Sequence, residues 1–437
     1  MQKKVQVIEC VKVILNDPLF KENHRTNSNF FTRDRKLSFV LLILIILQKS
    51  MKSLQLVLNE FFAKLPLPSV IVTASAFTQA RVKLSHTAFI ELNQKAVAET
   101  YYRDQDYKTW RGFRVLSVDG SKIILPNEEE IRKYFGVIRI ANQDRNVSGE
   151  YPAALASILY DVLNNIALDA ILSHAKAYEV NLATEHLDFV KENDLLLFDR
   201  NYPSYLFLAA LIRQNIDFLG RCSRSSFKEA RMMFESGTEE SKIVVLRPHH
   251  TKEKEIRELG LPEEIKVRFV RVVLDNGEVE VLVTSLTDES RYPANDFKEL
   301  YNLRWGIETF YGTIKGRLNL ENFTGKSVEA VRQDFYSTVF ITGLESILTR
   351  DARELLSANS SDNKCPQTVN KAVSFNTVKN YVIELFYKEE DTQILLDKLT
   401  QLFMTNPICV RKRKVPRKKS KPGKILNYYR RIRKICF

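Results

Sequence analysis

The segment 301–320, YNLRWGIETFYGTIKGRLNL, places a single carboxylate, Glu308, among cations and aromatic rings. At about 100° per residue, its polar members would share one face of a helix and its apolar members the opposite face. The polar face comprises Tyr301, Arg304, Glu308 and Lys315. An acid surrounded by cationic and hydroxyl groups suits phosphodiester chemistry. The acid would bind a metal ion, and its neighbours would bind phosphates. The alternative is an ordinary amphipathic helix with a solvated charged face.

Two aspartates could join Glu308. Asp119 and Asp199 each end a short apolar run, and the ends of strands in an open α/β sheet are where sites collect. Three such carboxylates can hold two Mg²⁺ ions about 4 Å apart, which activate a water or a 3′-hydroxyl and stabilise the leaving oxygen. Taken singly, Asp119 could merely begin an Asp-Gly turn and Asp199 could merely cap the next helix.

The elements that would position these acids change in kind along the chain. Residues 1–100 have the three- and four-residue spacing of helices, and Thr73 or Ser75 is a candidate N-cap. The helix that follows this cap either enters a DNA groove or belongs to a plain helical hairpin. The apolar run 39–47 is too short to span a bilayer and is expected to form a buried helix.

The next part of the chain favours strands. We expect two short strands around Asp119-Gly120 in 113–126, two more around Asn164-Asn165, and single strands at 194–200 and 216–223. A helix beginning near Pro203 separates the last two. This order predicts an α/β fold, with a mixed sheet covered by helices. Residues 224–297 are strand-rich again and are expected to form an insertion.

The composition is that of an ordinary soluble globular protein, with 437 residues, 44% hydrophobic and 27% charged. The five cysteines have no CxxC or Cys/His ligand spacing, which argues against a disulfide framework and a zinc site and suits a reducing cytoplasm. The net charge of +13 comes from residues 411–437, which contain thirteen Lys and Arg and no acid. This tail either binds a polyanion, with nucleic acid favoured over membrane, or only solvates the chain end.

These features resemble the insertion-sequence-four family of bacterial transposases. The spacing Tyr-x2-Arg-x3-Glu-x6-Lys at 301–315 is similar to the YREK signature of that family, and VDGSKI and LLFDRNYPSY are similar to the blocks around its first and second Asp. The family has an RNase H-like core with an Asp-Asp-Glu triad and a β-rich insertion between the second Asp and the Glu.

The resemblance implies roles for individual residues. Its metal ligands would be Asp119, Asp199 and Glu308, with two Mg²⁺ ions that Mn²⁺ could replace. Its DNA-contacting signature residues would be Tyr301, Arg304 and Lys315. Lys122 and Arg200, beside the two aspartates, are weaker candidates for phosphate contact.

One departure concerns a tryptophan in the β-rich insertion that, in the best-understood relatives, is associated with stacking on a flipped base during hairpin formation. The insertion of this chain has no Trp, since the two in the sequence are Trp110 and Trp305. Trp305, next to Arg304, is therefore the leading stacking candidate. The insertion itself offers the lesser aromatic platforms Phe227, Phe234, Phe269 and Tyr292.

The sequence thus predicts a cut-and-paste DNA transposase of the bacterial cytoplasm, associated with the nucleoid. Its partners would be the terminal inverted repeats, target DNA and a second copy of the chain, with no membrane. The expected parts are an end-binding region (1–100), a split catalytic core (101–223 and 298–350), the insertion (224–297) and a helical C-terminal region with the basic tail (351–437). An RNase H-like nuclease or resolvase without strand transfer, and an inactive DNA-binding descendant, are the alternatives.

Overall fold

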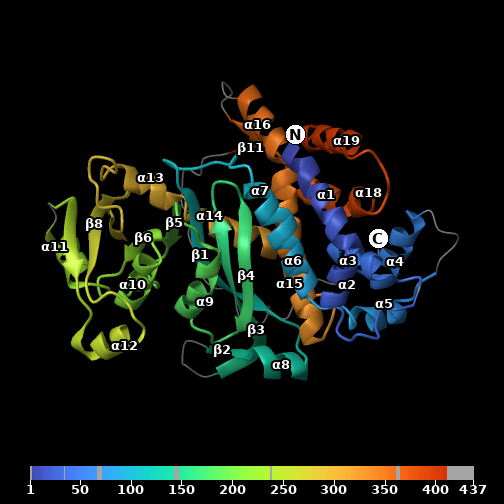
Figure 1. Cartoon of the computed structure of the whole chain (residues 1–437), viewed down its shortest axis with the longest axis horizontal. Coiled ribbons are helices and arrows are strands. Elements are labelled where there is room, and N and C mark those ends of the chain that lie inside the picture. The colour runs from blue at the N-terminus through green and yellow to red at the C-terminus, as the bar shows by residue number, and fades with distance from the viewer. Residues whose placement is uncertain are drawn as a thin grey trace. The chain divides into compact units, whose positions relative to one another are not determined.

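The computed structural model describes residues 2–33, 35–65, 71–141, 147–236, 239–360 and 365–410 (Figure 1). The chain forms two compact units, and each is made of separate stretches of sequence. The helical unit comprises Met1–Gln105, Ile124–Tyr134 and Ile314–Phe437. The sheet unit comprises Asp106–Ile123 and Phe135–Thr313.

The sheet unit is built on a mixed sheet, in which the described residues form nine strands. They are β1 (Arg114–Ile124), β2 (Val137–Ala141), β3 (Val147–Asp161), β4 (Ile166–His174), β5 (Asp194–Phe198), β6 (Asp217–Cys222), β7 (Ser241–Leu246), β8 (Ile265–Val273) and β9 (Val279–Thr284). The helices of this unit are α9 (Glu179–Glu185), η2 (His186–Phe189), α10 (Tyr205–Arg213), α11 (Lys228–Ser236), η3 (His250–Lys252), α12 (Glu253–Glu258), α13 (Asp296–Asn302) and α14 (Trp305–Gly312).

The strand order identifies the core of this sheet. Strand β3 pairs with β4 and lies next to β1, and β1, β5 and β6 follow as parallel neighbours. The order β4-β3-β1-β5-β6 is the RNase H-like arrangement, so the predicted mixed α/β fold is confirmed. Strands β9, β8 and β7, which come from the predicted insertion, extend the same sheet beyond β6 as antiparallel neighbours.

A buried hydrogen-bond chain fastens α9 and η2 to this sheet. The Nδ1–H of His186 donates to the Asp169 carboxylate on β4 at 2.6 Å, and its Nε2 lies 3.0 Å from the Ser157 hydroxyl on β3. Ser157 and His186 are both 0% exposed, so no substrate reaches this Ser-His-Asp set. The set therefore anchors the C-terminal end of α9 instead of serving nucleophilic catalysis.

The helical unit surrounds one long helix, α15 (Val328–Leu348), which is buried along most of its length. Helices α3, α6, η1 and α17 all contact it. The other elements of this unit are α1 (Gln2–Asn16), α2 (Pro18–His24), α3 (Phe39–Leu47), α4 (Leu54–Ala63), α5 (Ala74–Arg81), α6 (Thr87–Glu91), η1 (Leu92–Glu99), α7 (Thr100–Tyr102), α8 (Glu129–Phe135), η4 (Thr313–Arg317), α16 (Arg350–Asn359), β10 (Gln367–Thr368), α17 (Lys371–Asn380), α18 (Val382–Phe386), α19 (Thr392–Met404) and β11 (Ile408–Cys409).

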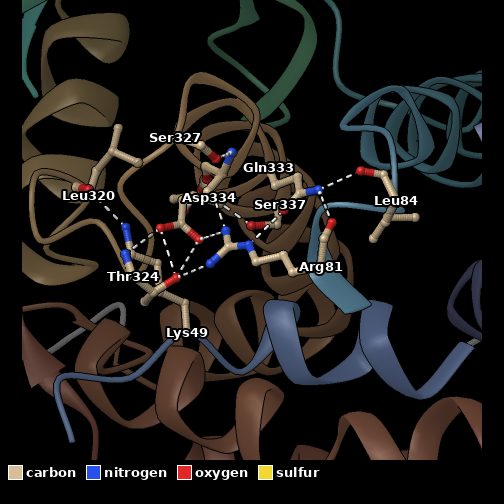
Figure 2. A network of polar contacts seen from close by, with 11 residues as sticks. Lys49, Arg81, Leu84, Leu320, Thr324, Ser327, Gln333, Asp334 and Ser337 are labelled. Atoms are coloured by element: carbon tan, nitrogen blue, oxygen red, sulfur yellow. Dashed lines mark hydrogen bonds and ion pairs between the residues drawn. The ribbon is translucent and has the colours of Figure 1, made fainter. Parts of the chain in front are cut away.

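A network of buried polar side chains joins the end of α5 to α15 (Figure 2). Arg81 donates to the Asp334 carboxylate at 2.8 Å, to the Gln333 amide oxygen at 2.6 Å and to the Thr324 hydroxyl at 2.7 Å. Gln333 in turn donates to the backbone carbonyl of Leu84 at 2.6 Å. Segments about 250 positions apart in the sequence are thus fixed to each other by hydrogen bonds that are buried away from water.

Several local predictions are confirmed. Thr73 is the N-cap of α5, and its hydroxyl accepts the Ala76 N–H at 3.1 Å. The run 39–47 forms α3, in which every residue except Val40 is buried. Asn165 adopts a φ of 60° in the turn between β3 and β4. No helix among the described residues is both long and apolar enough to cross a bilayer.

One strand prediction is wrong. The residues around Asp119-Gly120 do not form a turn between two short strands, because β1 runs without interruption from Arg114 to Ile124. Gly120 is not among the glycines with positive φ, so its backbone is not that of a hairpin turn. Its small size serves a close contact with Glu179, described below.

Candidate active site

Asp119 and Asp199 emerge side by side from two parallel strands. Strands β1 and β5 pair with Ser117 opposite Leu197, and each aspartate lies two residues beyond its member of that pair. Asp199 directly follows the end of β5, as predicted, whereas Asp119 lies inside β1 but beyond the part that pairs with β5. Equal offsets on parallel neighbours bring both carboxylates to the same edge of the sheet.

The environment of Asp119 reflects this proximity. Burial raises its pKa to about 7, and the charges of Asp199 and Glu179 act in the same direction, while the Gly120 N–H and the charge of Arg304 oppose the rise. The Gly120 N–H donates to Asp119 Oδ1 at 2.8 Å. Asp199 accepts a similar bond, at 2.7 Å, from the Asn201 N–H. Both carboxylates are thus oriented by the backbone that follows them.

Glu308 lies in the first turn of α14 and is held by Arg304. The guanidinium of Arg304 donates to Glu308 Oε1 at 2.7 Å, and the two side chains are 5% and 42% exposed. The same guanidinium lies 4.8 Å from the Trp305 ring centroid and 5.7 Å from that of Tyr301. Because the charge of Arg304 also acts on Asp119, this residue connects the glutamate electrostatically to the aspartate pair.

The prediction of one helix with a single displayed polar face is wrong. Helix α13 ends at Asn302, α14 begins at Trp305, and the chain then changes to the π-helix η4. Tyr301 and Arg304 are only 3% and 4% exposed, and the Tyr301 ring belongs to the apolar core cluster of the sheet unit. The break between the helices turns these two side chains inward and leaves Glu308 and Trp305 outside.

The remaining signature residue, Lys315, belongs to η4 in the helical unit. It is half-buried there, and burial lowers its pKa. Among the weaker candidates, Lys122 donates to the backbone carbonyl of Ala175, and Arg200 is exposed directly after Asp199. The contacts of all these residues with DNA stay predictions.

The aromatic candidates divide by exposure. Trp305 is 51% exposed, three residues before Glu308 on the same helix. Phe269 and Tyr292 are 0% and 5% exposed and have no open ring face, so the sequence overestimated them as stacking platforms. Phe227 and Phe234 are partly buried, with Phe227 packed edge-on against Phe269.

Two residues near the aspartates were not singled out from the sequence. Glu179, the first residue of α9, lies against Gly120, and Tyr202 follows Asp199 by three positions. The phenol of Tyr202 is 0% exposed and its hydroxyl has no hydrogen-bond partner within the described residues. Tyr202 stands inside the block LLFDRNYPSY and could have been noticed there, whereas Glu179 has no local signal.

The donor set fits a hard cation such as Mg²⁺, which prefers carboxylate oxygens and retains several waters. Across the described residues, no three His, Cys, Asp or Glu side chains are arranged to hold a metal ion directly. The orphaned Tyr202 hydroxyl lies close enough to Asp119, Glu179 and Asp199 for their charges, after burial, to raise its pKa. A hydrogen-bond donor among acids suits an ion that keeps part of its water shell.

Comparisons with known proteins find similarity to transposases. A family described as the Transposase DDE domain matches residues 110–343, a range that includes Asp119, Asp199 and Glu308. The chain is 25% identical over 293 residues to "Transposase InsG for insertion sequence element IS4" of Escherichia coli strain K12, covering 66% of this chain and 64% of that protein. It is 27% identical over 138 residues to "Putative transposase InsZ" of the same strain, covering 31% of this chain and 44% of that protein.

The matched part of the chain therefore spans less than two thirds of either relative. Among solved structures, a cryo-EM structure of the piggyBac transposase synaptic complex with hairpin DNA aligns with a TM-score of 0.46 and 10% identity. That alignment covers 94% of this chain and 86% of the piggyBac chain.

Proposed function

The chain belongs to the family of DDE transposases of the insertion-sequence-four type, and from this premise we propose that it cuts and joins DNA at the ends of an insertion sequence. The main observation behind the proposal is that Asp119 and Asp199 follow the paired residues of two neighbouring parallel strands by the same two positions. Glu308, held by an arginine whose charge reaches Asp119, supplies the third acid.

In this mechanism Asp119, Asp199 and Glu308 would together hold two Mg²⁺ ions, which Mn²⁺ could replace, with each ion keeping part of its water shell. The bound ions would activate a water or a 3′-hydroxyl for in-line attack and stabilise the leaving oxygen. Arg304 keeps the Glu308 carboxylate in a fixed orientation and offsets the negative charge of the acids. Glu308 stays 42% exposed on its side chain, so it remains reachable from solvent.

The DNA-binding surface would use residues around this site. In this proposal Arg200 and Lys122 would meet phosphates near the two aspartates, and Trp305 would meet a base. We assign Tyr301 and Lys315 to DNA contact on the family signature alone. Residues 1–100 would bind the terminal inverted repeats, and two copies of the chain would bring both ends and the target DNA together.

The direct test incubates the protein with Mg²⁺ and DNA carrying the ends of its own element. Excision of the ends followed by joining to a second DNA supports the transposase. Cleavage without joining would instead support the nuclease or resolvase, and end binding without nicking would support the inactive descendant.

The basic tail lies outside the described residues, and its role is tested by deletion. Removing residues 411–437, with thirteen cations, should weaken binding equally for end DNA and unrelated DNA. The slope of log affinity against log salt should become shallower by about 0.9 for every phosphate that the tail neutralises in the wild type. Binding isotherms at several salt concentrations measure this slope, and a full-length variant with the tail cations replaced by Gln is the matched control. An unchanged slope would show that the tail only solvates.

If the protein makes hairpin ends, we expect Trp305→Ala to slow hairpin formation by about 5- to 150-fold, because stacking on a flipped base contributes about 1–3 kcal/mol. Trp305→Phe keeps a ring and should have a much smaller effect. Denaturing gels of labelled ends measure the rate. Normal hairpin formation by the Ala variant would transfer the role to Phe227 or Phe234, or to another kind of pocket.

A further inference from the structure

The hydroxyl of Tyr202 is the starting point, because a buried polar group without a partner is uncommon. Its ring packs against Phe198 and Phe207, with centroids at 6.2 and 6.1 Å. Leaving a buried hydroxyl unsatisfied destabilises the fold, and two apolar neighbours give no compensation. The cost is explained if the hydroxyl has a function, since such exceptions concentrate at sites that bind an ion or water.

The surroundings of this hydroxyl are acidic. The charges of Asp119, Glu179 and Asp199 all act on the Tyr202 phenol, in that order of strength, and the charge of Arg304 acts against them. The phenol O–H is influenced by three carboxylate charges, yet it is hydrogen-bonded to none of them. Water held between such groups satisfies both sides at once.

Glu179 is positioned for the same place by a close backbone approach. A Cβ atom on residue 120 would lie 2.9 Å from Glu179 Cγ and 3.0 Å from its Oε1, so the carboxyl rests directly on Gly120, next to Asp119. The helix that carries Glu179 is fixed at its other end by the buried His186. Lys122 partly offsets the charge of Glu179, and Arg304 that of Asp119.

We propose that Glu179 and Tyr202 are part of the cation site, where the carboxylate and the hydroxyl hydrogen-bond the water shell of a Mg²⁺ ion that Asp119 and Asp199 bind directly. This inference rests on the proposed transposase function. It agrees with the finding that no three acids among the described residues form a direct metal site, because Mg²⁺ commonly takes only one or two carboxylates and keeps several waters. Glu179 and Tyr202 are thus positioning residues for the ion.

Titration of the full-length protein with Mn²⁺, in the absence of DNA, tests the proposal without an activity assay. Free Mn²⁺ is measured by electron paramagnetic resonance. Glu179→Gln and Tyr202→Phe should each weaken Mn²⁺ binding by about tenfold or more, as expected for groups that orient a metal's first ligands. The matched controls are Glu185→Gln and Tyr205→Phe. Glu185 is an exposed acid on the same helix, and the native Tyr205 hydroxyl donates to the Pro262 carbonyl instead. Both controls should bind Mn²⁺ like the wild type.

Asp119→Asn separates the possible failures. If it loses Mn²⁺ binding while either Glu179→Gln or Tyr202→Phe binds normally, the added role is wrong and the proposed function stands. If Asp119→Asn itself binds Mn²⁺ normally, the proposed function fails. Thermal melting gives a second readout, because removing an unsatisfied hydroxyl should leave the melting temperature of Tyr202→Phe unchanged or raised. A lowered melting temperature would indicate a structural role and overturn the proposal.

Discussion

Glu308→Gln is expected to lower the rate of cleavage of end DNA by at least about a thousandfold, while DNA affinity changes by no more than about twofold. A carboxylate that holds catalytic cations contributes several kcal/mol to the transition state, and each 1.4 kcal/mol is about tenfold in rate. The amide keeps the shape of the side chain and can still contact Arg304, which donates to Glu308 at 2.7 Å. Single-turnover cleavage and binding isotherms separate the two effects.

Glu299→Gln is the matched control for this prediction, because Glu299 is an exposed acid on the neighbouring helix α13. It should cleave and bind like the wild type. Comparable losses of cleavage and binding in Glu308→Gln would contradict the metal role and indicate that Glu308 organises the DNA surface.

Arg81→Met is expected to lower the free energy of unfolding of the helical unit by about 3–5 kcal/mol, since it leaves a buried carboxylate without its main cation. The Arg81 and Asp334 side chains are 5% and 1% exposed. Lys52→Met is the control, because Lys52 and its partner Glu60 are 41% and 55% exposed and such a pair contributes at most about 1 kcal/mol. Hydrogen exchange of α15 amides measures the change locally. Equal effects of the two substitutions would show that the network adds little.

The same network predicts a pH dependence. Burial alone would raise the pKa of Asp334, but the charges of Arg81 and Lys49 and the Thr324 N–H bond bring it below its ordinary value. A lowered carboxyl pKa stabilises the fold above the unfolded pKa of about 4, and this contribution is lost as the pH falls through the lowered value. The free energy of unfolding of the wild type should therefore exceed that of Asp334→Asn by a constant amount from about pH 5 to 7, and this difference should shrink under more acidic conditions.

The sequence predicted well where local chemistry decides the structure. Asp199 follows an apolar strand, Asn165 makes its turn and Thr73 caps its helix because each depends on neighbouring residues. Asp119 was placed in a turn because Asp-Gly usually makes one. In the structure the glycine instead gives room to Glu179, which lies 59 positions away in the sequence.

The site was harder to predict where tertiary packing decides it. A helical wheel cannot reveal the break between α13 and α14, which buries Tyr301 and Arg304 and leaves Trp305 outside. Glu179 lies against Gly120 on a helix whose other end His186 fixes to β3 and β4. Neither arrangement follows from propensity or from the period of the apolar residues.

The helical unit is made of three separate stretches of sequence, and this affects the chain during synthesis. Residues 1–105 leave the ribosome more than 200 residues before Ile314, which begins the last stretch of their unit. At about 5–20 residues per second, the early helices wait roughly 10–40 s for α15 and for the carboxylate that neutralises Arg81. Nascent chains should therefore expose apolar surface to chaperones during this interval, and messages truncated before α15 should yield aggregation-prone fragments instead of a separable DNA-binding domain.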